Sequence, residues 1–341
     1  MPAEWEPHEA TWLGWPHEVT DWPGKFATIP WAFAEIVRHL SRVERVHLLV
    51  ENASAAKRVR IILKKSGALL ENVDFFHVPT DRGWMRDSGP ICVANESGEV
   101  AFNHFVFNGW AKYANHKRDA AAVTKLNRKL KRKVFLPVHK GRRVVLEGGS
   151  IDVNGKGTLL TTEECLLSKT QERNPGFTRQ DYEEIFREYL GVKKAIWLKN
   201  GIAGDDTHGH VDDLSRFVDA NTVVTIVEEN RDDANYAALW ENLEILKSSS
   251  DQDGKALRVV TLPMPAPIYF DKQQLPASYA NFYIANKLVI VPTFTDGKDR
   301  VALNTIAQLF PGREVIGIPC RDLVLGLGTL HCMTQQQPSG R

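Results

Sequence analysis

The chain repeats one order of elements five times, and this repetition constrains its fold more than any other feature. Helical periodicity gives way each time to a short apolar run, a polar loop and another short run, which predicts helix–strand–loop–strand units. The expected helices cover about 54–65, 118–130, 179–190, 234–246 and 299–309. The strands that follow them are expected at 73–78, 134–138, 195–198, 258–262 and 315–318.

One polar landmark stands near the end of each unit: Asp87, Glu147, Asp212, Asn281 and Cys332. Repeats of roughly 50 to 70 residues favour a closed radial arrangement whose loops converge on an axis. We therefore expect a five-fold pseudosymmetric α/β propeller that forms a single domain over residues 1–341. An open doubly wound sheet is the alternative, but no glycine-rich phosphate-binding fingerprint follows the first expected strand.

Charge and hydropathy exclude several classes of partner. Lys and Arg number 43 against 42 Asp and Glu, which gives a formal charge of +1 and no field that would attract nucleic acid or an anionic membrane. The basic stretch 125–133 is expected to be the solvated face of a helix. No signal-peptide pattern opens the sequence, and no apolar run approaches the ~20 residues of a membrane span. We expect a cytoplasmic protein.

Cys332 is the cysteine that most invites a chemical interpretation. Gly326 and Gly328 precede it and His331 adjoins it, as expected where the backbone bends tightly to present a thiol in a cavity. A buried structural cysteine is the alternative. The four cysteines lie far apart without CxxC spacing, which argues against a zinc knuckle or a disulfide framework. Thiol chemistry implies a reducing compartment.

The polar landmarks suit a cationic, planar substrate. His210 and Asp212 are two residues apart, so an extended 210–212 segment would point both side chains to one face. Two carboxylates such as Asp87 and Asp212 can clamp a guanidinium by charge-assisted hydrogen bonds and leave its carbon open to attack. Cys332 is the available nucleophile, and the cation would favour its thiolate.

Two other chemistries compete with this interpretation. His208, His210 and Asp212 have the spacing of metal ligands on one strand face. We expect no metal and no organic cofactor, because nothing else at motif spacing completes a ligand set. A papain-like thiol hydrolase would need oxyanion donors, rather than carboxylates, around the reacting carbon.

Sequence stretches along nearly the whole chain resemble the agmatine deiminase and bacterial peptidylarginine deiminase family, within the guanidino-group-modifying (pentein) superfamily. The matching stretches, in order, are 1–8, 83–90, 107–110 with Lys112 and Tyr113, 146–150, 205–207 with 209–212, 275–283 and 331–336. The resemblance implies a five-fold α/β propeller with a central active site, the pentein fold.

The resemblance also implies roles for individual residues. It makes Cys332 the nucleophile, His210 the general acid and base, Asp87 and Asp212 the guanidinium clamp, and Glu147 a supporting group. Attack on the guanidino carbon would release ammonia and leave an amidino-thioether, which water hydrolyses to a ureido product. The implied reaction is agmatine and water to N-carbamoylputrescine and ammonia, a step of putrescine and polyamine biosynthesis.

The substrate pocket is expected to be narrow and walled by aromatic side chains. We expect Trp84, Trp110, Asp206 and Gly328 to bind the substrate. The remaining candidates for the wall are Trp12, Trp15 and Trp22. Arg86 is a candidate partner for a substrate carboxylate, although its position beside Asp87 favours an internal ion pair.

The chain departs from typical agmatine deiminases close to the reacting groups. Leu327 and Thr329 stand where those enzymes have glycine and asparagine, and His208 stands where they have aspartate. A deiminase acting on peptidyl-arginine or on another guanidine therefore stays open, as do an amidinotransferase and a non-catalytic arginine-binding module. A homodimer is also left open.

Overall fold

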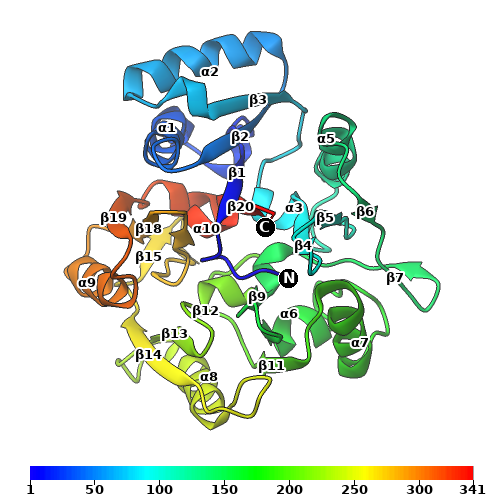
Figure 1. The fold of residues 1–341 in the computed structure, drawn as a ribbon. Helices are drawn as coiled ribbons and strands as arrows, with labels where there is room; N and C mark the ends of the chain where they lie inside the picture. The colour runs from blue at the N-terminus through cyan, green and yellow to red at the C-terminus, as the bar shows by residue number, and fades with distance from the viewer. Residues whose placement is uncertain (341) are drawn as a thin grey trace.

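The computed structural model describes residues 1–340, and five β-sheets surround a common centre in it (Figure 1). The first sheet has the order β20 (Thr334–Pro338), β1 (His8–Gly14), β2 (Arg45–Val50) and β3 (Val73–His77). The second and third are β4 (Ile91–Ala94), β5 (Val100–Asn103) and β6 (Val134–Phe135), then β9 (Asp152–Val153), β10 (Thr158–Thr162) and β11 (Lys194–Leu198). The fourth and fifth are β12 (Ser215–Phe217), β13 (Thr222–Val227) and β14 (Arg258–Pro263), then β17 (Tyr283–Ile284), β18 (Leu288–Thr293) and β19 (Glu314–Pro319).

Each sheet repeats the same strand pattern. In the four three-stranded sheets the middle strand is antiparallel to the strand before it and parallel to the strand after it, as β13 is to β12 and β14. In the first sheet β1 has these neighbours in β20 and β2, and β3 adds one more parallel strand. Parallel neighbours need a crossover connection, which is helical here. Six crossover helices lie on the rim of the ring (Figure 1): α1 (Ile29–Leu40), α2 (Ala53–Ser66), α5 (Ala122–Leu130), α7 (Arg179–Leu190), α8 (Tyr236–Ser248) and α9 (Asp299–Leu309). The crossovers also contain the short helices α4 (Lys117–Ala120) and α6 (Glu163–Leu167), and α6 lies closer to the centre.

Helix α7 illustrates why these segments fold as the sequence predicts. Thr178 and Asp181 form a reciprocal capping box at its start, and Gly191 takes the left-handed conformation that ends it. Tyr182 and Phe186 lie on its buried face and pack toward the third sheet. Both α7 and α9 have the bounds expected from the sequence.

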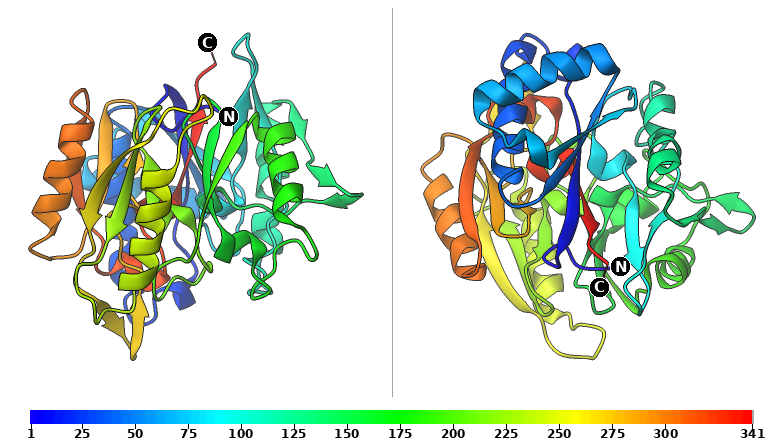
Figure 2. Two further views of the ribbon diagram at one scale, coloured as in Figure 1. Left: turned by 90° about the horizontal axis from the view of Figure 1, so that it is seen from below. Right: turned by 45° about the horizontal axis from the view of Figure 1, so that its top comes forward.

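The ring is closed by two segments that are distant in sequence. Strand β20 runs antiparallel to β1 and places Trp12 opposite Gln335 (Figure 2). The indole nitrogen of Trp12 donates to Gln337 Oε1 at 3.0 Å, and both side chains are fully buried. The first sheet is therefore completed only by residues that follow the fifth sheet.

The α/β class and the five-unit propeller are confirmed, with some differences within the units. The sequence-based prediction missed the middle strands of four units, which are β5, β10, β13 and β18. The expected strand 134–138 is split into β6 and β7 (Val138–His139), because Pro137 between them has no N–H to donate. Strand β7 pairs with β8 (Arg142–Arg143) in a hairpin, and β15 (Ile268–Phe270) pairs with β16 (Gln273–Leu275) in another. Across residues 1–340, every helix is too short or too polar to traverse a lipid bilayer.

Candidate active site

The polar landmarks lie where the chain passes from one sheet to the next. Asp87 is in α3 (Met85–Ser88), Glu147 precedes the short 3-10 helix Gly148–Ser150, and Asp212 is in the 3-10 helix Val211–Asp213. Asn281 precedes β17, and Cys332 is in α10 (Leu330–Met333), directly before β20. All five are buried, and these connections converge near the centre of the ring (Figure 1).

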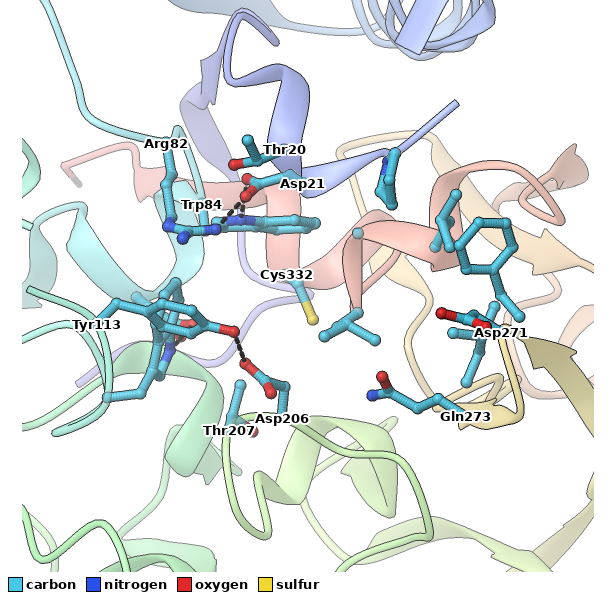
Figure 3. A pocket seen from close by; sticks show the side chains of 18 residues that line it. Thr20, Asp21, Arg82, Trp84, Tyr113, Asp206, Thr207, Asp271, Gln273 and Cys332 are labelled. Atoms are coloured by element: carbon cyan, nitrogen blue, oxygen red, sulfur yellow. Dashed lines mark hydrogen bonds and ion pairs between the residues drawn. The ribbon is translucent and has the colours of Figure 1, made fainter. Parts of the chain in front are cut away.

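The sulfur of Cys332 faces a cavity of about 470 Å³ (Figure 3). Asn281 Nδ2 donates to this sulfur at 3.0 Å, and Asp212 Oδ2 lies 3.8 Å from it. Burial, followed by the charges of Asp212, Asp213 and Asp87, raises the pKa of the Cys332 thiol well above its usual value. A cation beside the sulfur is therefore needed for the thiolate to form readily near neutral pH.

His210 is fully buried among three carboxylates. Its Nδ1 lies 3.8 Å from Asp87 Oδ1 and 4.0 Å from Asp212 Oδ1, and its Nε2 lies 3.8 Å from Glu147 Oε2. Burial lowers the pKa of His210, but the charge of Asp87 and the neighbouring Glu147 outweigh it and raise that pKa well above its usual value. The imidazole of His210 passes close to Gly149, where a Cβ atom would lie 2.4 Å from His210 Nδ1.

Asp87 lines the cavity and Asp212 lies beside Cys332, and different donors hold the two carboxylates. Asp87 Oδ1 accepts from the Gly149 N–H at 3.0 Å, and its Oδ2 accepts from Trp110 Nε1 at 2.9 Å. Burial raises the pKa of Asp87 to about 6. Asp212 Oδ2 accepts from His331 Nδ1 at 2.6 Å, and although burial acts in the opposite direction, this bond lowers the pKa of Asp212. Asp212 Oδ1 has no hydrogen-bond partner within residues 1–340.

Glu147 stands behind His210 and does not line the cavity. Arg173 Nε donates to Glu147 Oε1 at 3.0 Å, and both side chains are fully buried. Burial raises the pKa of Glu147, but Arg173 and His210 together bring it down to about 2. Arg173 also donates to the backbone oxygens of Gln171 and Thr207, so this carboxylate is fixed by a residue that sequence reasoning did not single out.

Three of the four residues expected to bind substrate line the cavity, and the fourth, Gly328, lies against Cys332. Trp84, Trp110 and Asp206 line it, and Asp206 is held by Lys112 and by the Tyr113 hydroxyl at 2.7 Å. A Cβ atom on Gly328 would lie 3.0 Å from Cys332 Cβ, so only glycine leaves the thiol uncrowded. Lining residues that sequence reasoning did not name include Asp21, Arg82, Asp271 and Gln273 (Figure 3).

The other tryptophans do not form the wall. Trp12 is fully buried and packs edge-on against His47 and Phe76, away from the cavity. Trp15 packs against Phe33. Trp22 lies behind Trp84, with ring centroids 5.7 Å apart, and supports it from outside the cavity.

The prediction that residues 210–212 are extended is wrong. His208 and Gly209 have positive φ angles of 64° and 92°, which turn the chain into a 3-10 helix over Val211–Asp213. The adjoining strand β12 starts only at Ser215. His210 and Asp212 nevertheless meet, because the turn brings their side chains to the same place.

The proposed His208, His210 and Asp212 metal set is not assembled. His208 Nε2 lies 3.1 Å from Ser168 Oγ and its Nδ1 lies 3.7 Å from Glu164 Oε1, so it turns away from the other two residues.

Other groups in residues 1–340 have metal-type ligand atoms within 4.8 Å of one another: Glu147 with Cys165 and His210, Asp212 with Asp213 and Cys332, and His139 with Asp181 and Glu184. In the first group Arg173 already balances the charge of Glu147, and in the third Lys140 pairs with Asp181. In the second group Cys332 lines the cavity, and the carboxylates beside it suit a guanidinium equally well.

Arg86 is not available to a substrate. Its guanidinium pairs with Glu4 at 3.1 Å and donates to Gln336 at 2.7 Å, and the side chain is 3% exposed. Arg86 therefore forms an internal ion pair, as expected, although its partner is Glu4 and not the neighbouring Asp87.

Two of the departures from typical agmatine deiminases have visible consequences. Thr329 donates from its hydroxyl to Asn281 Oδ1 at 2.7 Å, and so helps to hold the amide that contacts Cys332. Leu327 lines the cavity in a left-handed conformation with φ of 66°, which glycine adopts at no steric cost.

A ring of five α/β sheets, with a thiol, an imidazole and paired carboxylates at its centre, defines the class of guanidino-group-modifying enzymes. The chain belongs to the Porphyromonas-type peptidyl-arginine deiminase family, whose model matches residues 1–338. It is 35% identical to the agmatine deiminase of Pseudomonas aeruginosa, over 100% of this chain and 96% of that protein.

Solved structures agree with this assignment. A cysteine-to-serine variant of C. jejuni agmatine deiminase with substrate bound is 32% identical, with a TM-score of 0.88 over 100% of this chain and 96% of its own. The Enterococcus faecalis agmatine deiminase is 30% identical, with a TM-score of 0.89 over 99% and 95%. An amidinotransferase from Microseira wollei, 12% identical over 99% and 96% with a TM-score of 0.52, shares the fold alone.

Proposed function

We propose that this protein hydrolyses agmatine to N-carbamoylputrescine and ammonia through a covalent intermediate on Cys332. Its family shows that the protein is a hydrolase acting on guanidino groups. One observation carries the finer proposal: the buried thiol of Cys332 and the buried carboxylate of Asp87 line one cavity, and the buried carboxylate of Asp212 lies 3.8 Å from the sulfur. A bound guanidinium would supply the positive charge that this arrangement lacks.

The bound substrate would be clamped before it reacts. Asp87 and the unpartnered Oδ1 of Asp212 would accept hydrogen bonds from the guanidinium nitrogens. The cation would lower the thiol pKa of Cys332, because its charge offsets the burial and the neighbouring carboxylates that raise it. The planar guanidino carbon would then present one face to the sulfur.

Each half-reaction would use His210 in a different protonation state. The thiolate forms a bond to the guanidino carbon, and the tetrahedral adduct collapses as His210 gives its proton to the departing nitrogen, which leaves as ammonia. His210 then takes a proton from water, whose oxygen attacks the amidino-thioether carbon. The carbon–sulfur bond breaks, the sulfur leaves as a thiolate, and the added hydroxyl loses its proton to solvent as the ureido product forms. Glu147, fixed by Arg173, would stabilise the imidazolium form of His210 before the first proton transfer and after the second.

The charges at the cavity mouth favour an amine at the far end of the substrate. Asp21 pairs with Arg82, and Asp206 pairs with Lys112. Asp271, in the turn between β15 and β16, lines the same cavity and has no ion-pair partner within residues 1–340. Asp271 is therefore the carboxylate free to meet the ammonium group of agmatine.

A substrate carboxylate would find less support there. Arg82 is the cation among the lining residues, and Asp21 already neutralises it. Leaving a substrate carboxylate unpaired among acidic groups costs several kcal/mol, which corresponds to a selectivity of ~100-fold or more for agmatine over arginine.

The test is ammonia release from agmatine, free arginine and a blocked arginine peptide, measured side by side. We expect agmatine to give the highest kcat/KM, with no effect of a chelator. More efficient turnover of arginine or the peptide would replace the named substrate and keep the deiminase chemistry. An amidino product that appears only with an added amine acceptor would indicate an amidinotransferase, and no turnover of any guanidine would indicate a binding module.

A further inference from the structure

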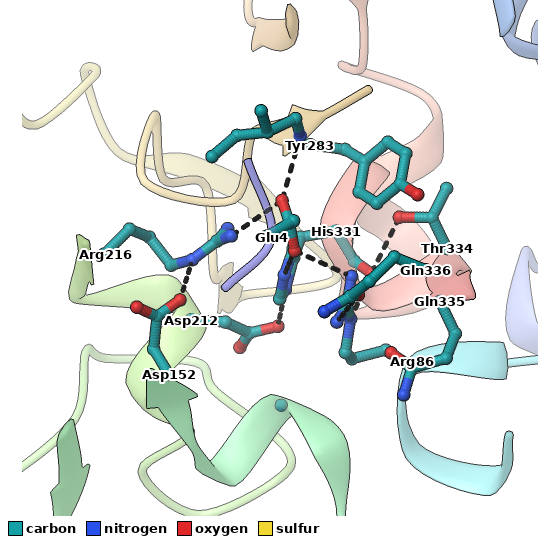
Figure 4. A network of polar contacts seen from close by, with 12 residues as sticks. Glu4, Arg86, Asp152, Asp212, Arg216, Tyr283, His331, Thr334, Gln335 and Gln336 are labelled. Atoms are coloured by element: carbon teal, nitrogen blue, oxygen red, sulfur yellow. Dashed lines mark hydrogen bonds and ion pairs between the residues drawn. The ribbon is translucent and has the colours of Figure 1, made fainter. Parts of the chain in front are cut away.

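The N-terminal segment contributes one carboxylate to the region behind the cavity (Figure 4). Glu4 is 6% exposed. Its Oε1 accepts from the Ile284 N–H at 2.8 Å and lies 2.8 Å from Arg216 Nη2. Its Oε2 accepts from Arg86 Nη2 at 3.1 Å and from His331 Nε2 at 2.8 Å. Glu4 thus contacts four segments that come from different parts of the ring.

His331 stands between Glu4 and the clamp residue Asp212. Its Nε2 lies 2.8 Å from Glu4 Oε2, and its Nδ1 lies 2.6 Å from Asp212 Oδ2. An ionised carboxylate oxygen only accepts hydrogen bonds, so each ring nitrogen has to donate and the ring carries both protons. Flanking carboxylates are the arrangement that makes such a buried imidazolium tolerable.

The bond from His331 decides which oxygen of Asp212 faces the substrate. Oδ2 is taken by His331, while Oδ1 has no partner within residues 1–340. A neutral His331 could carry its single proton on either nitrogen. In the molecules with the proton on Nε2, Asp212 would have no donor from Nδ1 to fix its orientation. The carboxylate of Glu4 removes this choice, because it stabilises the doubly protonated ring, in which Nε2–H donates to Glu4 and Nδ1–H donates to Asp212.

We propose that Glu4 is a positioning residue of the deimination site, which acts through His331 to hold Asp212 with Oδ1 directed at the guanidinium. This inference rests on the proposed function, because it assigns to Asp212 a cationic partner in the cavity. Arg86 and Arg216 also contact Glu4, so its loss would disturb packing as well. The test therefore needs a readout that altered stability alone would not change.

Alkylation of Cys332 by two matched reagents provides this readout. Chloroacetamidine is cationic and resembles the guanidinium, whereas chloroacetamide is neutral and of nearly the same shape. The wild-type protein should react faster with the amidine. In Glu4→Gln the ratio of the two rates should fall by at least ~10-fold, while the chloroacetamide rate stays within about twofold.

Asp152→Asn is the matched control. Asp152 is buried in the same network and accepts from Arg216 Nε at 2.6 Å, as Glu4 pairs with Arg216 Nη2. Its polar partners are Arg216 and the Phe217 N–H, and it forms no hydrogen bond or ion pair with His331. Asp152→Asn should lower the melting temperature and leave the ratio of rates unchanged.

The outcomes separate this inference from the proposed function. A Glu4→Gln protein that keeps the wild-type ratio, whatever its melting temperature, overturns the positioning role and leaves the proposed function intact. A wild-type protein without any preference for the amidine overturns both. If Glu4→Gln yields no folded protein, Glu4→Asp is tested instead. This variant keeps the negative charge but moves the carboxylate away from His331 by the length of one methylene. Its ratio should fall by at least ~3-fold, and an unchanged ratio overturns the inference.

Discussion

The side-chain amide of Asn281 donates to the sulfur of Cys332 at 3.0 Å. The same amide nitrogen lies 2.9 Å from Asp213 Oδ1, and the amide oxygen accepts from the Thr329 hydroxyl and from the His331 N–H at 3.0 Å. Asn281 therefore fixes both the sulfur and the backbone of the segment that carries it. Its bond to sulfur lowers the pKa of the Cys332 thiol, against the burial and the carboxylates that raise it.

Replacement of Asn281 by alanine should reduce kcat more than it changes KM. The thiolate would lose a donor worth about 1–3 kcal/mol, which corresponds to a loss of ~5- to 150-fold in kcat. The rate of Cys332 alkylation by neutral chloroacetamide, followed against pH, should shift its midpoint upward. A kcat within about twofold of wild type would show that the amide does not assist the thiolate.

Replacement of Cys332 by serine should abolish turnover and leave the fold intact, because a hydroxyl is a poor nucleophile without a strong base. Chloroacetamidine should label Cys332 and spare Cys92, Cys165 and Cys320, which are buried and do not line the cavity. Peptide mass mapping locates the label. Appreciable ammonia release by the serine variant would rule out the covalent route.

Asp87→Asn and Asp212→Asn should each cost at least ~2–5 kcal/mol of transition-state stabilisation, because each removes a charged partner of a desolvated guanidinium. The measurement is kcat/KM for agmatine, with melting temperatures to confirm folding. Asp232→Asn, at an exposed loop position, serves as the control and should behave as wild type. A nearly unchanged kcat/KM in either variant would remove that residue from the clamp.

The stability of the protein should depend on pH through Asp87. Its pKa in the folded protein is about 6, above its ordinary value of 3.8, so the folded state binds the proton more tightly than the unfolded state. Stability should therefore fall as pH rises from about 4 to about 6, by about 2 kcal/mol between pH 4.5 and 7.5. Urea unfolding at these two pH values measures the change, which Asp87→Asn should lack.

The same ionisation should limit catalysis. Because the clamp needs the ionised carboxylate, kcat/KM for agmatine should decline below about pH 6. Equal pH dependence of stability in wild type and Asp87→Asn would show that another group is responsible.

Asp271→Asn should raise KM for agmatine by roughly 5- to 20-fold and change kcat little, because the residue would contact only the distal ammonium. Butylguanidine, which lacks that amine, provides the comparison. Its kinetic constants should be the same in wild type and variant. An equal loss with both substrates would place the effect of Asp271 elsewhere in the turn between β15 and β16.

The repeat and the polar landmarks could be predicted because they are local in sequence. Helical periodicity marked α7 and α9 to the residue, and Asp87, Asp212 and Cys332 stand in polar connections between apolar runs. The middle strands β10 and β13 were missed, although they are apolar runs of ordinary length. Each follows a short polar turn, at 154–157 and 219–221, and the expected unit of two strands had no place for a third.

Contacts between distant residues could not be predicted in this way. Glu4, Arg173 and His331 are recognised only by their partners, which lie in other units of the ring. A sequence shows that such residues are polar, but not that each is buried against an opposite charge. The turn at Gly209 was missed for another reason, since residues 210–212 alternate as a strand does and only the φ angles reveal the bend.

Strand β20 links catalytic competence to the closure of the ring. Cys332 lies two residues before this strand, and β20 is held in the first sheet by its antiparallel pairing with β1. This pairing joins residues more than three hundred positions apart, so it is expected to form late in folding and to be an early place of local opening. Loss of activity under mild denaturant should therefore precede global unfolding, and the accessibility of one thiol would report on the integrity of the whole ring.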